Sequence, residues 1–560
     1  MEETLKKLIQ EALGKLGLEA DTVTLEYPAD PQNGDFSTNI AMVLAKKVGK
    51  NPKELAEEIV TQMNLTPDPL LEGEGAIQVA GPGFINFFLA RDFFTEQLVS
   101  ATKENWGANT SFSGKKILVE HSSPNLFKPF HIGHLMNNTV GESIVRLARA
   151  SGATVATMSF PSDISLGVAK AIFILLENGT IVDETTDVVV LGDAYVAGVK
   201  RYDENESVQA RVKEIADNLY AGTPSPELSL FDMCKKINMQ YFVSITESLG
   251  STFDSFVYES EAGVRGKELV KEYTPKVFTE SEGAVVYIPE EGSKLHTAVF
   301  LNSQDNPTYE AKDIGLLDIK FATQHPDLSI FVTDAQQVSH FAVVLDAGRH
   351  IHPEWAEKSL HRYHGRMSFK GQKMSSRLGG VPLVVDIVDT VVEEVKEKNP
   401  DIDATTASMV SLGAIKYAIL KSQAGKNINF DPDTSLSFEG DSGPYLQYTA
   451  VRAGSLLKKA LDAGISPATT AGEVHGAELL EKYISRFPSV VEESQGEWSP
   501  HYLVTYLTEL AQAFNSWYGQ GKIIDEDTLL TSQRLLVVDA VRNTLTRGLW
   551  MLGIEVPEKM

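Results

Sequence analysis

Apolar residues recur at helical spacing in the first part of the chain. The opening stretch MEETLKKLIQEALGKLGLEA mixes them with charges of both signs, which predicts an amphipathic helix ending near Gly17. A second helix is expected to begin at Pro52, because Asn51 can cap it and Glu54 completes a capping box. GAIQVAGPGFINFFLA then predicts short strands broken by glycine and proline. The polar, turn-rich stretch KENWGANTSFSGKK follows, and we place the end of a small α+β domain at residue 110.

A strand–helix–strand unit is predicted next. Residues 117–119 are a short apolar run, as in a buried parallel strand. LMNNTVGESIVRLARASG carries apolar residues at helical spacing, and TVATMSF follows as another strand. This order predicts an α/β domain of Rossmann type, with a parallel sheet, over residues 111–380.

Two further changes of pattern complete the predicted organisation. Residues from about 175 to 275 are mostly helical and highly charged, which indicates an insertion between two halves of the sheet. Strand patterns return in GAVVYIP, TAVFLN, LSIFVTD and RYHGRMSF. Residues 381–560 are predicted to be all-α, since YLQYTAVRAGSLLKKALDAG and LLVVDAVRNTLTRGLWMLG carry the apolar stripe of bundle helices.

Composition narrows the class of protein. The single cysteine, Cys234, allows no disulfide within the chain and no cysteine cluster for zinc, so we expect no resident metal and a reducing, cytoplasmic setting. We find no signal peptide pattern and no apolar run of about 20 residues, so no membrane role is expected. The net charge of −26 argues against non-specific nucleic-acid binding, and any such partner would need a local basic surface.

The stretch HSSPNLFKPFHIGH, residues 121–134, lies between the first predicted strand and helix of the α/β domain. Ligands of such sheets bind beyond the carboxyl ends of strands, and a helix N-terminus favours anions. His131 and His134 could donate to phosphate oxygens, and Gly133 would let a flat ligand approach the backbone. Taken alone, these letters more often mark packed structural histidines.

A second stretch, FKGQKMSSRLGG, could act on the same ligand. Its glycines and its positive charges, Lys370, Lys373 and Arg377, suit a loop that closes on a triphosphate and stabilises the leaving pyrophosphate. The alternative is a solvated basic turn.

Together and in this order, the two stretches resemble the class I aminoacyl-tRNA synthetases. VEHSSPNLFKPFHIGH is similar to the arginyl-tRNA synthetase pattern Glu-x-Ser-Ser-Pro-Asn-x-x-Lys-Pro-x-His-x-Gly-His. GDFSTNIAMVLAKKVGKNPKELAEEI, GPGFINFFL, YLQYTAVR and LGIEVPEKM are also similar to that family, so the resemblance covers essentially the whole chain. It implies three domains: an N-terminal domain for the tRNA elbow, a catalytic domain and a C-terminal anticodon-binding bundle.

The resemblance implies an arginine–tRNA ligase. Such an enzyme activates L-arginine with ATP and Mg²⁺ and then loads the 3′ end of tRNA(Arg), without a tightly bound cofactor. We expect a monomer. The rivals are a class I synthetase for glutamate, glutamine or cysteine, a non-catalytic paralogue that binds RNA, and a small-molecule adenylyltransferase.

Roles for individual residues follow from the family pattern. Ser376 stands where many class I enzymes have a second lysine, and Lys128 is expected to supply that charge. The residues implied in catalysis are Lys128, His131, His134, Lys373 and Ser375. Those implied in ATP binding are Lys128, His131, Gly133, His134, His340, Lys373, Met374 and Ser376.

The remaining roles concern arginine and tRNA. Tyr309 and Asp313 lie four residues apart on one predicted helix face, and Asp313 is expected to pair with the guanidinium through two hydrogen bonds. The residues implied in arginine binding are Glu120, Ser123, Asn125, Tyr309, Asp313 and Gln337. Those implied in tRNA binding are Tyr445, Gln447, Tyr448 and Arg452. The chain departs from the family pattern at Ser162 and Ser165, which replace glycines, and at Leu378.

Overall fold

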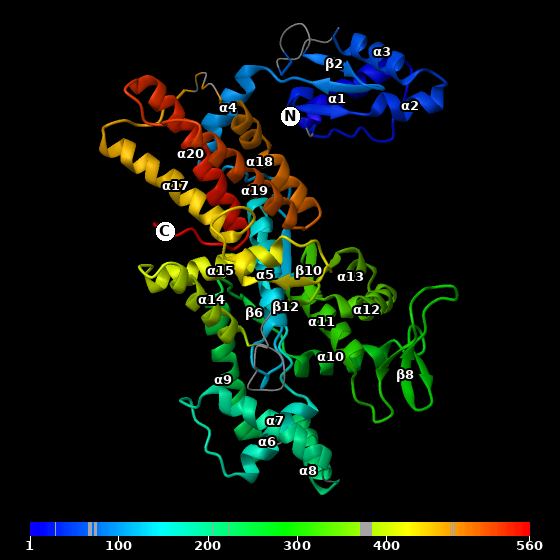
Figure 1. The fold of residues 1–560 in the computed structure, drawn as a ribbon. Helices are drawn as coiled ribbons and strands as arrows, with labels where there is room; N and C mark the ends of the chain where they lie inside the picture. The colour runs from blue at the N-terminus through cyan, green and yellow to red at the C-terminus, as the bar shows by residue number, and fades with distance from the viewer. Residues whose placement is uncertain are drawn as a thin grey trace. The chain divides into compact units, whose positions relative to one another are not determined.

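The computed structural model describes residues 1–28, 30–64, 70–71, 76–204, 206–222, 224–369, 383–470, 472, 474 and 476–560 (Figure 1). They form two compact units. One consists of Met1–Trp106, Arg452–Phe487 and Gln512–Thr544, and the other of Gly107–Val451, Pro488–Ala511 and Leu545–Met560. No helix in the described part of the chain has both the length and the hydropathy to cross a bilayer.

The first unit begins with a small α+β fold. Its antiparallel sheet has the order β1-β3-β2, with β1 (Phe36–Thr38), β2 (Ile77–Ala80) and β3 (Phe84–Phe87), and carries α1 (Glu2–Lys15), α2 (Ile40–Val48) and α3 (Pro52–Asn64). The predicted start of α3 is confirmed, because Asn51 Oδ1 accepts a hydrogen bond from Lys53 N at 2.9 Å. Leu5, Ile9, Leu55 and Phe87 are fully buried between the helices and the sheet.

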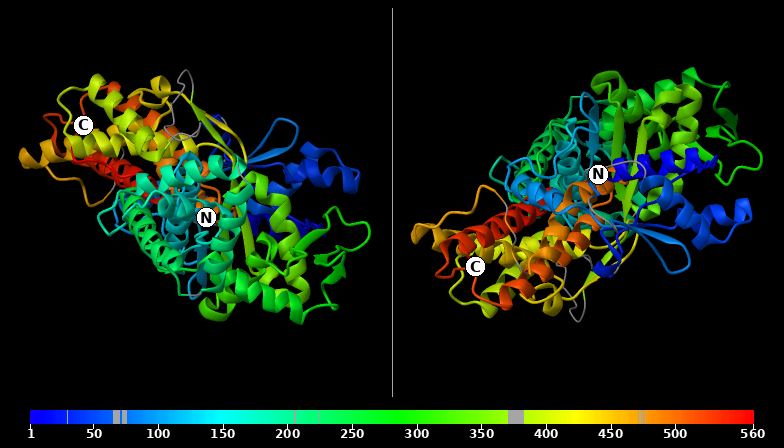
Figure 2. Two further views of the ribbon diagram at one scale, coloured as in Figure 1. Left: turned by 90° about the horizontal axis from the view of Figure 1, so that it is seen from below. Right: turned by 90° about the horizontal axis from the view of Figure 1, so that it is seen from above.

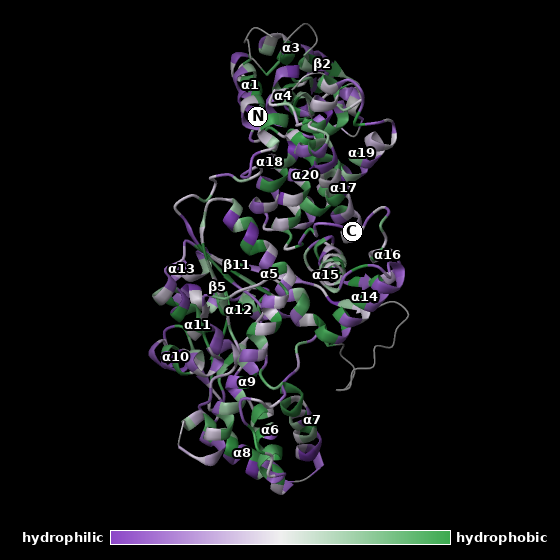
Figure 3. Cartoon of the chain, turned by 90° about the vertical axis from the view of Figure 1, so that its left-hand side faces the viewer, coloured by the Kyte–Doolittle hydropathy of each residue, from purple (hydrophilic) through white to green (hydrophobic). Residues whose placement is uncertain are grey.

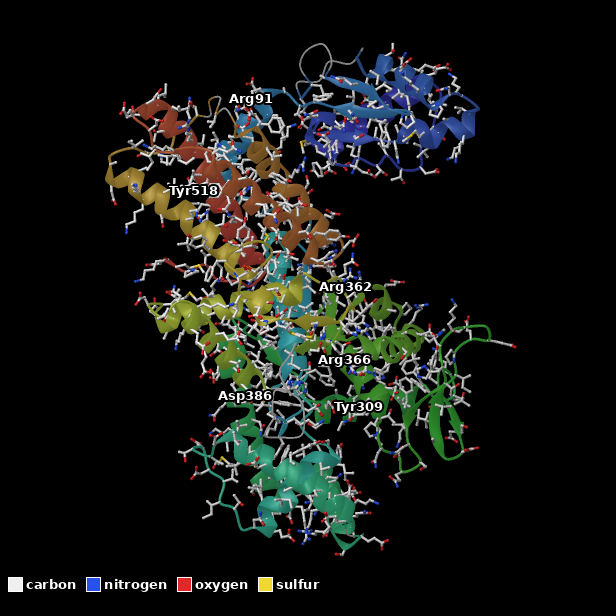
Figure 4. The ribbon with its side chains drawn as sticks, in the orientation of Figure 1. Arg91, Tyr309, Arg362, Arg366, Asp386 and Tyr518 are labelled. Atoms are coloured by element: carbon white, nitrogen blue, oxygen red, sulfur yellow. The ribbon has the colours of Figure 1, made fainter. Side chains whose placement is uncertain are left out.

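Five longer helices belong wholly or partly to this unit. They are α4 (Arg91–Ala101), α17 (Gly443–Asp462), α18 (Glu478–Gly496), α19 (His501–Gly519) and α20 (Thr528–Met551). Arg91, labelled in Figure 4, donates both terminal nitrogens to the buried carboxylate of Glu481. Trp106 Nε1 donates to Thr544 Oγ1 at 3.1 Å. These bonds fasten the segment after the small domain to the C-terminal helices within the unit.

The second unit is built on a parallel sheet, which confirms the predicted fold class. Its order is β11-β10-β4-β5-β6, with β4 (Lys116–Glu120), β5 (Thr154–Ser159), β6 (Ser255–Phe256), β10 (Leu328–Asp334) and β11 (Ser359–His364). β4 lies in the middle of the sheet, with β5 on one side and β10 on the other. The order in which the chain adds strands therefore reverses direction at β4. Ligands of open α/β sheets bind at such a switch point.

Side chains alternate along the strands and pack against helices on both faces of the sheet. Figure 2 shows the ribbon from two further directions. Ile117 and Val119 of β4 pack with Ile144 of α5 (Ile132–Ala150) on one face. Leu118 packs with Leu316 of α11 (Tyr309–Gln324), and α10 (Glu259–Glu272) also covers that face. The buried strand is therefore apolar at consecutive positions, as its sequence predicted.

Two substructures interrupt the sheet in sequence. Between β5 and β6 lie α6 (Leu166–Glu177), α7 (Val188–Glu204), α8 (Glu206–Ala221) and α9 (Pro226–Ser248), which enclose their own apolar core. Within it, α6 is coloured mostly hydrophobic (Figure 3). Between α10 and α11 lies a separate antiparallel sheet of β7 (Thr279–Ser281), β8 (Ala284–Tyr287) and β9 (Ala298–Leu301).

The remaining elements complete the second unit. They are α12 (Val338–Ile351), α13 (Pro353–Glu357), β12 (Met367–Phe369), α14 (Val384–Lys398), α15 (Ala404–Leu420), β13 (Ile428–Phe430) and α16 (Pro432–Ser435), with short 3₁₀ turns at Pro31–Asn33 in the first unit and Ala335–Gln337 in the second. α15 packs against α5, so it lies beneath the helix that begins at the histidines.

Side chains from α5 and α15 hold the end of the chain by its backbone. Ser143 Oγ donates to Met551 O at 3.0 Å, and Arg146 Nη1 donates to Trp550 O at 3.0 Å. Lys416 Nζ is buried and donates to Gly553 O at 2.6 Å and to Leu249 O at 2.8 Å. The last residues are therefore part of the core beneath α5.

Replacing Lys416 with methionine should change how stability depends on pH. Burial lowers the pKa of Lys416 from 10.5 to about 8, so the unfolded chain binds more protons between those values and the wild type gains stability as pH rises through them. The stability lead of the wild type over K416M should grow by about 3 kcal/mol from pH 7 to 10.5. Urea unfolding at several pH values measures it. The exposed Lys398→Met is the control, and an equal difference at all pH values would contradict the assignment.

Candidate active site

A cavity of about 590 Å³ opens beyond the carboxyl ends of β4, β10 and β11, at the start of α5. It is lined by Glu120, Ser123, Asn125, His131, Gly133, His134, Asn137, Phe160, Ser162, Glu259, Tyr309, Lys312, Asp313, Val332, Thr333, Asp334, Gln336, Gln337, His340, Phe341 and His364. Two distant parts of the sequence thus meet in one cavity, including His131 and Asp313.

The two histidines form a reciprocal cap at the start of α5. His131 Nδ1 accepts from Gly133 N at 3.1 Å, and His134 Nδ1 accepts from His131 N at 3.2 Å. Their rings stack with centroids 3.9 Å apart. Since each Nδ1 is an acceptor, a neutral ring carries its proton on Nε2. Both imidazoles are therefore set to donate from Nε2.

The surroundings favour the neutral histidines. Burial lowers the pKa of both His131 and His134, and the positive charge of Lys128 lowers both further. Lys128 is exposed, with its ammonium 5.6 Å from the ring centre of Tyr195. The cavity thus has what we call a phosphate end: two N–H donors at a helix N-terminus with a lysine charge nearby.

Gly133 is fixed by the cap itself. A Cβ added there would lie 3.0 Å from His131 Cε1 and 3.2 Å from its Nδ1. A larger residue would push against the imidazole that accepts from Gly133 N. Glycine at this position therefore helps to keep the His131 ring where the cap places it.

Carboxylates gather in another part of the cavity, which we call the acidic end. Glu120 forms a buried ion pair with Lys320, and Glu259 forms one with Lys312 at 2.7 Å. Asp313 Oδ2 accepts from His340 Nε2 at 2.6 Å. Burial raises the pKa of Asp313, whereas the contact with His340 lowers it.

Tyr309 and Asp313 line the same cavity from one face of α11, as their spacing predicted. Tyr309, which is labelled in Figure 4, begins the helix. Its exposed fraction is 63%. The ammonium of Lys312 lies 5.2 Å from its ring centre. A cationic ligand here would meet a carboxylate on one side and an open aromatic ring beside it.

The departures from the family pattern have local explanations. The backbone of Ser162 bridges to Asn125, and both residues line the cavity. Ser165 Oγ accepts from Val168 N at 3.2 Å and caps α6, which a glycine could not do. Leu378 lies outside the described residues, as do the predicted site residues Lys373, Met374, Ser375 and Ser376.

Sequence reasoning missed six polar residues of the cavity: Asn137, Glu259, Lys312, Thr333, Asp334 and His364. Asp334 and His364 end two parallel strands, a signal that could have found them. Lys312 is adjacent to the predicted Asp313. Glu259 starts α10 inside the stretch interpreted as an insertion, and no local pattern marks it.

The structure does not support two of the tRNA assignments. Tyr445 is 8% exposed, and Gln447 is fully buried. Gln447 Nε2 donates to Met409 O at 3.1 Å and to Glu555 O at 2.7 Å. A side chain enclosed and bonded in this way is not available to a nucleotide, so these two predictions are not kept. Tyr448 and Arg452 are half-buried, and Arg452 bonds Asn515.

Comparisons with known proteins agree along the whole chain. The family described as tRNA synthetases class I (R), catalytic domain, matches residues 95–431. The arginyl tRNA synthetase N terminal domain matches residues 3–89, and the DALR anticodon binding domain matches 446–560. Arginine–tRNA ligases of Clostridium perfringens and Treponema denticola are 28% and 29% identical, over 99% and 100% of this chain and 100% and 99% of their own.

A solved structure gives the same result. The arginyl-tRNA synthetase of Thermus thermophilus is 27% identical and superimposes with a TM-score of 0.82, covering 100% of both chains. Sequence, domain order and fold therefore agree, and the chain belongs to the arginyl-tRNA synthetases of class I.

Proposed function

We infer that this chain is an arginine–tRNA ligase. The observation that carries the inference is one cavity with two chemically different ends, in a chain that matches the family over its whole length. The acidic end suits a guanidinium, and the phosphate end suits a triphosphate. Since the relatives share one name, neither another amino-acid specificity nor a non-catalytic role is favoured.

In the first step, the carboxylate of arginine attacks the α-phosphate of MgATP, and pyrophosphate leaves. The Nε2–H groups of His131 and His134 donate to phosphate oxygens on which charge develops. Lys128 adds a positive charge from outside the cavity. No side-chain nucleophile is required, because the rate comes from positioning and electrostatic stabilisation.

The guanidinium binds at the acidic end. Asp313 is its anionic acceptor, and Tyr309 walls the pocket. Glu120 and Glu259 already pair with lysines. These ion pairs hold the shape of the cavity, and the lysine charges reduce the repulsion between the carboxylates. Ser123, Asn125 and Gln337 contact the amino-acid part of the substrate.

In the second step, the terminal adenosine of tRNA(Arg) attacks the arginyl-adenylate through a ribose hydroxyl. The residues matched by the DALR domain, 446–560, bind the anticodon region, and the N-terminal domain meets the elbow. The enzyme acts as a monomer in the cytoplasm. Lys373, through its match to the family pattern, adds positive charge against the ATP phosphates.

Pyrophosphate exchange into ATP tests the proposal. The reaction is run with each amino acid in turn, with and without a tRNA(Arg) transcript. Exchange should appear with arginine when the tRNA is present. If arginine with cognate tRNA gives no exchange and no charged tRNA, the proposed function fails.

Replacing Lys128 with alanine should lower exchange roughly ten- to hundredfold, because a charge that stabilises the phosphates is lost. tRNA affinity, measured by filter binding, should stay within about twofold. Lys200→Ala, which removes an exposed lysine of α7, is the matched control. Equal losses of exchange and tRNA binding would mean that Lys128 is structural.

A further inference from the structure

His340 of α12 lies between two carboxylates that project from α11. Its Nε2 is 2.6 Å from Asp313 Oδ2, and its Nδ1 is 3.5 Å from Glu310 Oε1. The three side chains are largely enclosed, with exposed fractions of 23%, 12% and 22% for His340, Asp313 and Glu310. Glu310 and Asp313 are three residues apart on one helix, so both can reach the same ring.

This contact decides which oxygen of Asp313 a ligand can use. Oδ2 is occupied by His340, and Oδ1 makes no hydrogen bond with any residue that the structure describes. Asp313 and His340 both line the cavity. A guanidinium therefore approaches Oδ1, and a contact through both oxygens, as the sequence suggested, would require His340 to give up Oδ2.

We propose that His340 is a positioning residue for the amino-acid substrate, which orients Asp313 and keeps it ionised so that Oδ1 accepts the guanidinium. This rests on the proposed function. It also gives His340 a role different from the ATP contact implied by the family resemblance, because its hydrogen-bond partner is Asp313 at the acidic end.

The charges around the pair give this role its physical basis. Burial raises the pKa of Asp313, and the nearby Glu120 and Glu259 raise it further, while His340 opposes both. Burial alone would lower the pKa of His340, but its bonds to Asp313 and Glu310 outweigh that and raise it to about 9. His340 is therefore a cation at neutral pH, and its charge favours the ionised form of Asp313, which is the form that pairs with a guanidinium.

The other groups packed against His340 do not supply that charge. His361 of β11 has its pKa lowered to about 4 by burial and by His340, so it is neutral where the enzyme works. Phe341 meets the His340 ring edge-on, with centroids 4.9 Å apart. Three side chains shift the pKa of Asp313: Glu120 and Glu259, which are acidic, and His340, which carries the positive charge.

The test uses His340→Gln in the full-length protein, because glutamine can donate a hydrogen bond but carries no charge. Exchange is measured with arginine, ATP and tRNA(Arg) over a range of pH. KM for arginine should rise roughly ten- to hundredfold, with KM for ATP within about twofold. The acid limb of kcat/KM for arginine should move to higher pH, because the pKa of Asp313 rises when the cation is lost.

Two further variants make the result decisive. Glu310→Gln keeps the histidine but weakens its charge, so it should shift the acid limb in the same direction by less. His350→Gln, an exposed histidine on the same helix, should change nothing. If H340Q does not fold, as judged by its melting temperature, the E310Q profile decides.

The proposal is overturned if KM for ATP rises while KM for arginine does not, since His340 would then serve the nucleotide. It is also overturned if the acid limb stays in place in the folded variants. Failure of the proposed function looks different, because the wild-type chain itself would then give no exchange with arginine.

Discussion

Replacing Asp313 with asparagine is expected to lower kcat/KM for arginine by roughly a hundred- to thousandfold. The substitution removes the ionised acceptor from an enclosed site, and the new amide group turns N–H donors towards a guanidinium that has only donors. The histidine at 2.6 Å also loses its anionic partner, so His340 is left as a poorly compensated cation beside the substrate. The lost attraction to Asp313 and the added repulsion from His340 both weaken the binding of arginine.

The measurement is exchange at varied arginine and at varied ATP, in the presence of tRNA(Arg). KM for ATP should stay within about twofold, because the phosphate end is built from other elements. Asp318→Asn is the control: it lies on the same helix and accepts from Arg265 Nε at 2.7 Å, outside the cavity lining. Parallel losses for arginine and ATP in D313N would show that the carboxylate supports the fold instead of the guanidinium.

The sequence predicted what depends on local patterns. The start of α3, the buried run of β4 and the βαβ order are confirmed, and so is the Rossmann-type fold, because each rests on spacing or capping within a few residues. The strands β8 and β9 were also expected. Their partners were not, because pairing into a separate antiparallel sheet depends on contacts distant in sequence.

In the site, too, the sequence predicted what depends on local spacing and missed what depends on contacts distant in sequence. Spacing and family pattern predicted that Tyr309 and Asp313 share a helix face, and both line the cavity. Nothing local indicated that His340 would bond Asp313, because the contact joins two helices across the chain. Gln447 failed for a related reason. It matched a family segment, but the backbone carbonyls that bury it come from α15 and the last residues.

The two ends of the cavity have opposite chemistry because they come from different parts of the fold. The phosphate end consists of two imidazole donors that a helix start holds in place, because the backbone N–H groups of His131 and Gly133 bond the two Nδ1 atoms. The acidic end is side-chain chemistry, in which each carboxylate is held by a cation from a neighbouring element. We therefore expect substitutions at the phosphate end to lower mainly kcat, and substitutions at the acidic end to raise mainly the KM for arginine.

Replacing His134 with alanine should show that division most clearly. The variant loses the Nε2–H donor and the Nδ1 acceptor that bonds His131 N, so the reciprocal cap opens and His131 loses its stacked neighbour. We expect kcat to fall by roughly a hundred- to thousandfold. KM for arginine should stay within about threefold, since Asp313 and His340 are untouched.

A second variant separates the donor from the cap. His134→Asn can still accept from His131 N but lacks a donor at the reach of Nε2, so it should regain stability without regaining kcat. His296→Ala, an exposed histidine before β9, is the control. Burial holds the pKa of His134 well below 6.5, so its ring is neutral at neutral pH. The wild-type kcat should therefore show no acid limb near pH 6.5, and such a limb that vanished in H134N would mean that His134 acts as a titrating cation.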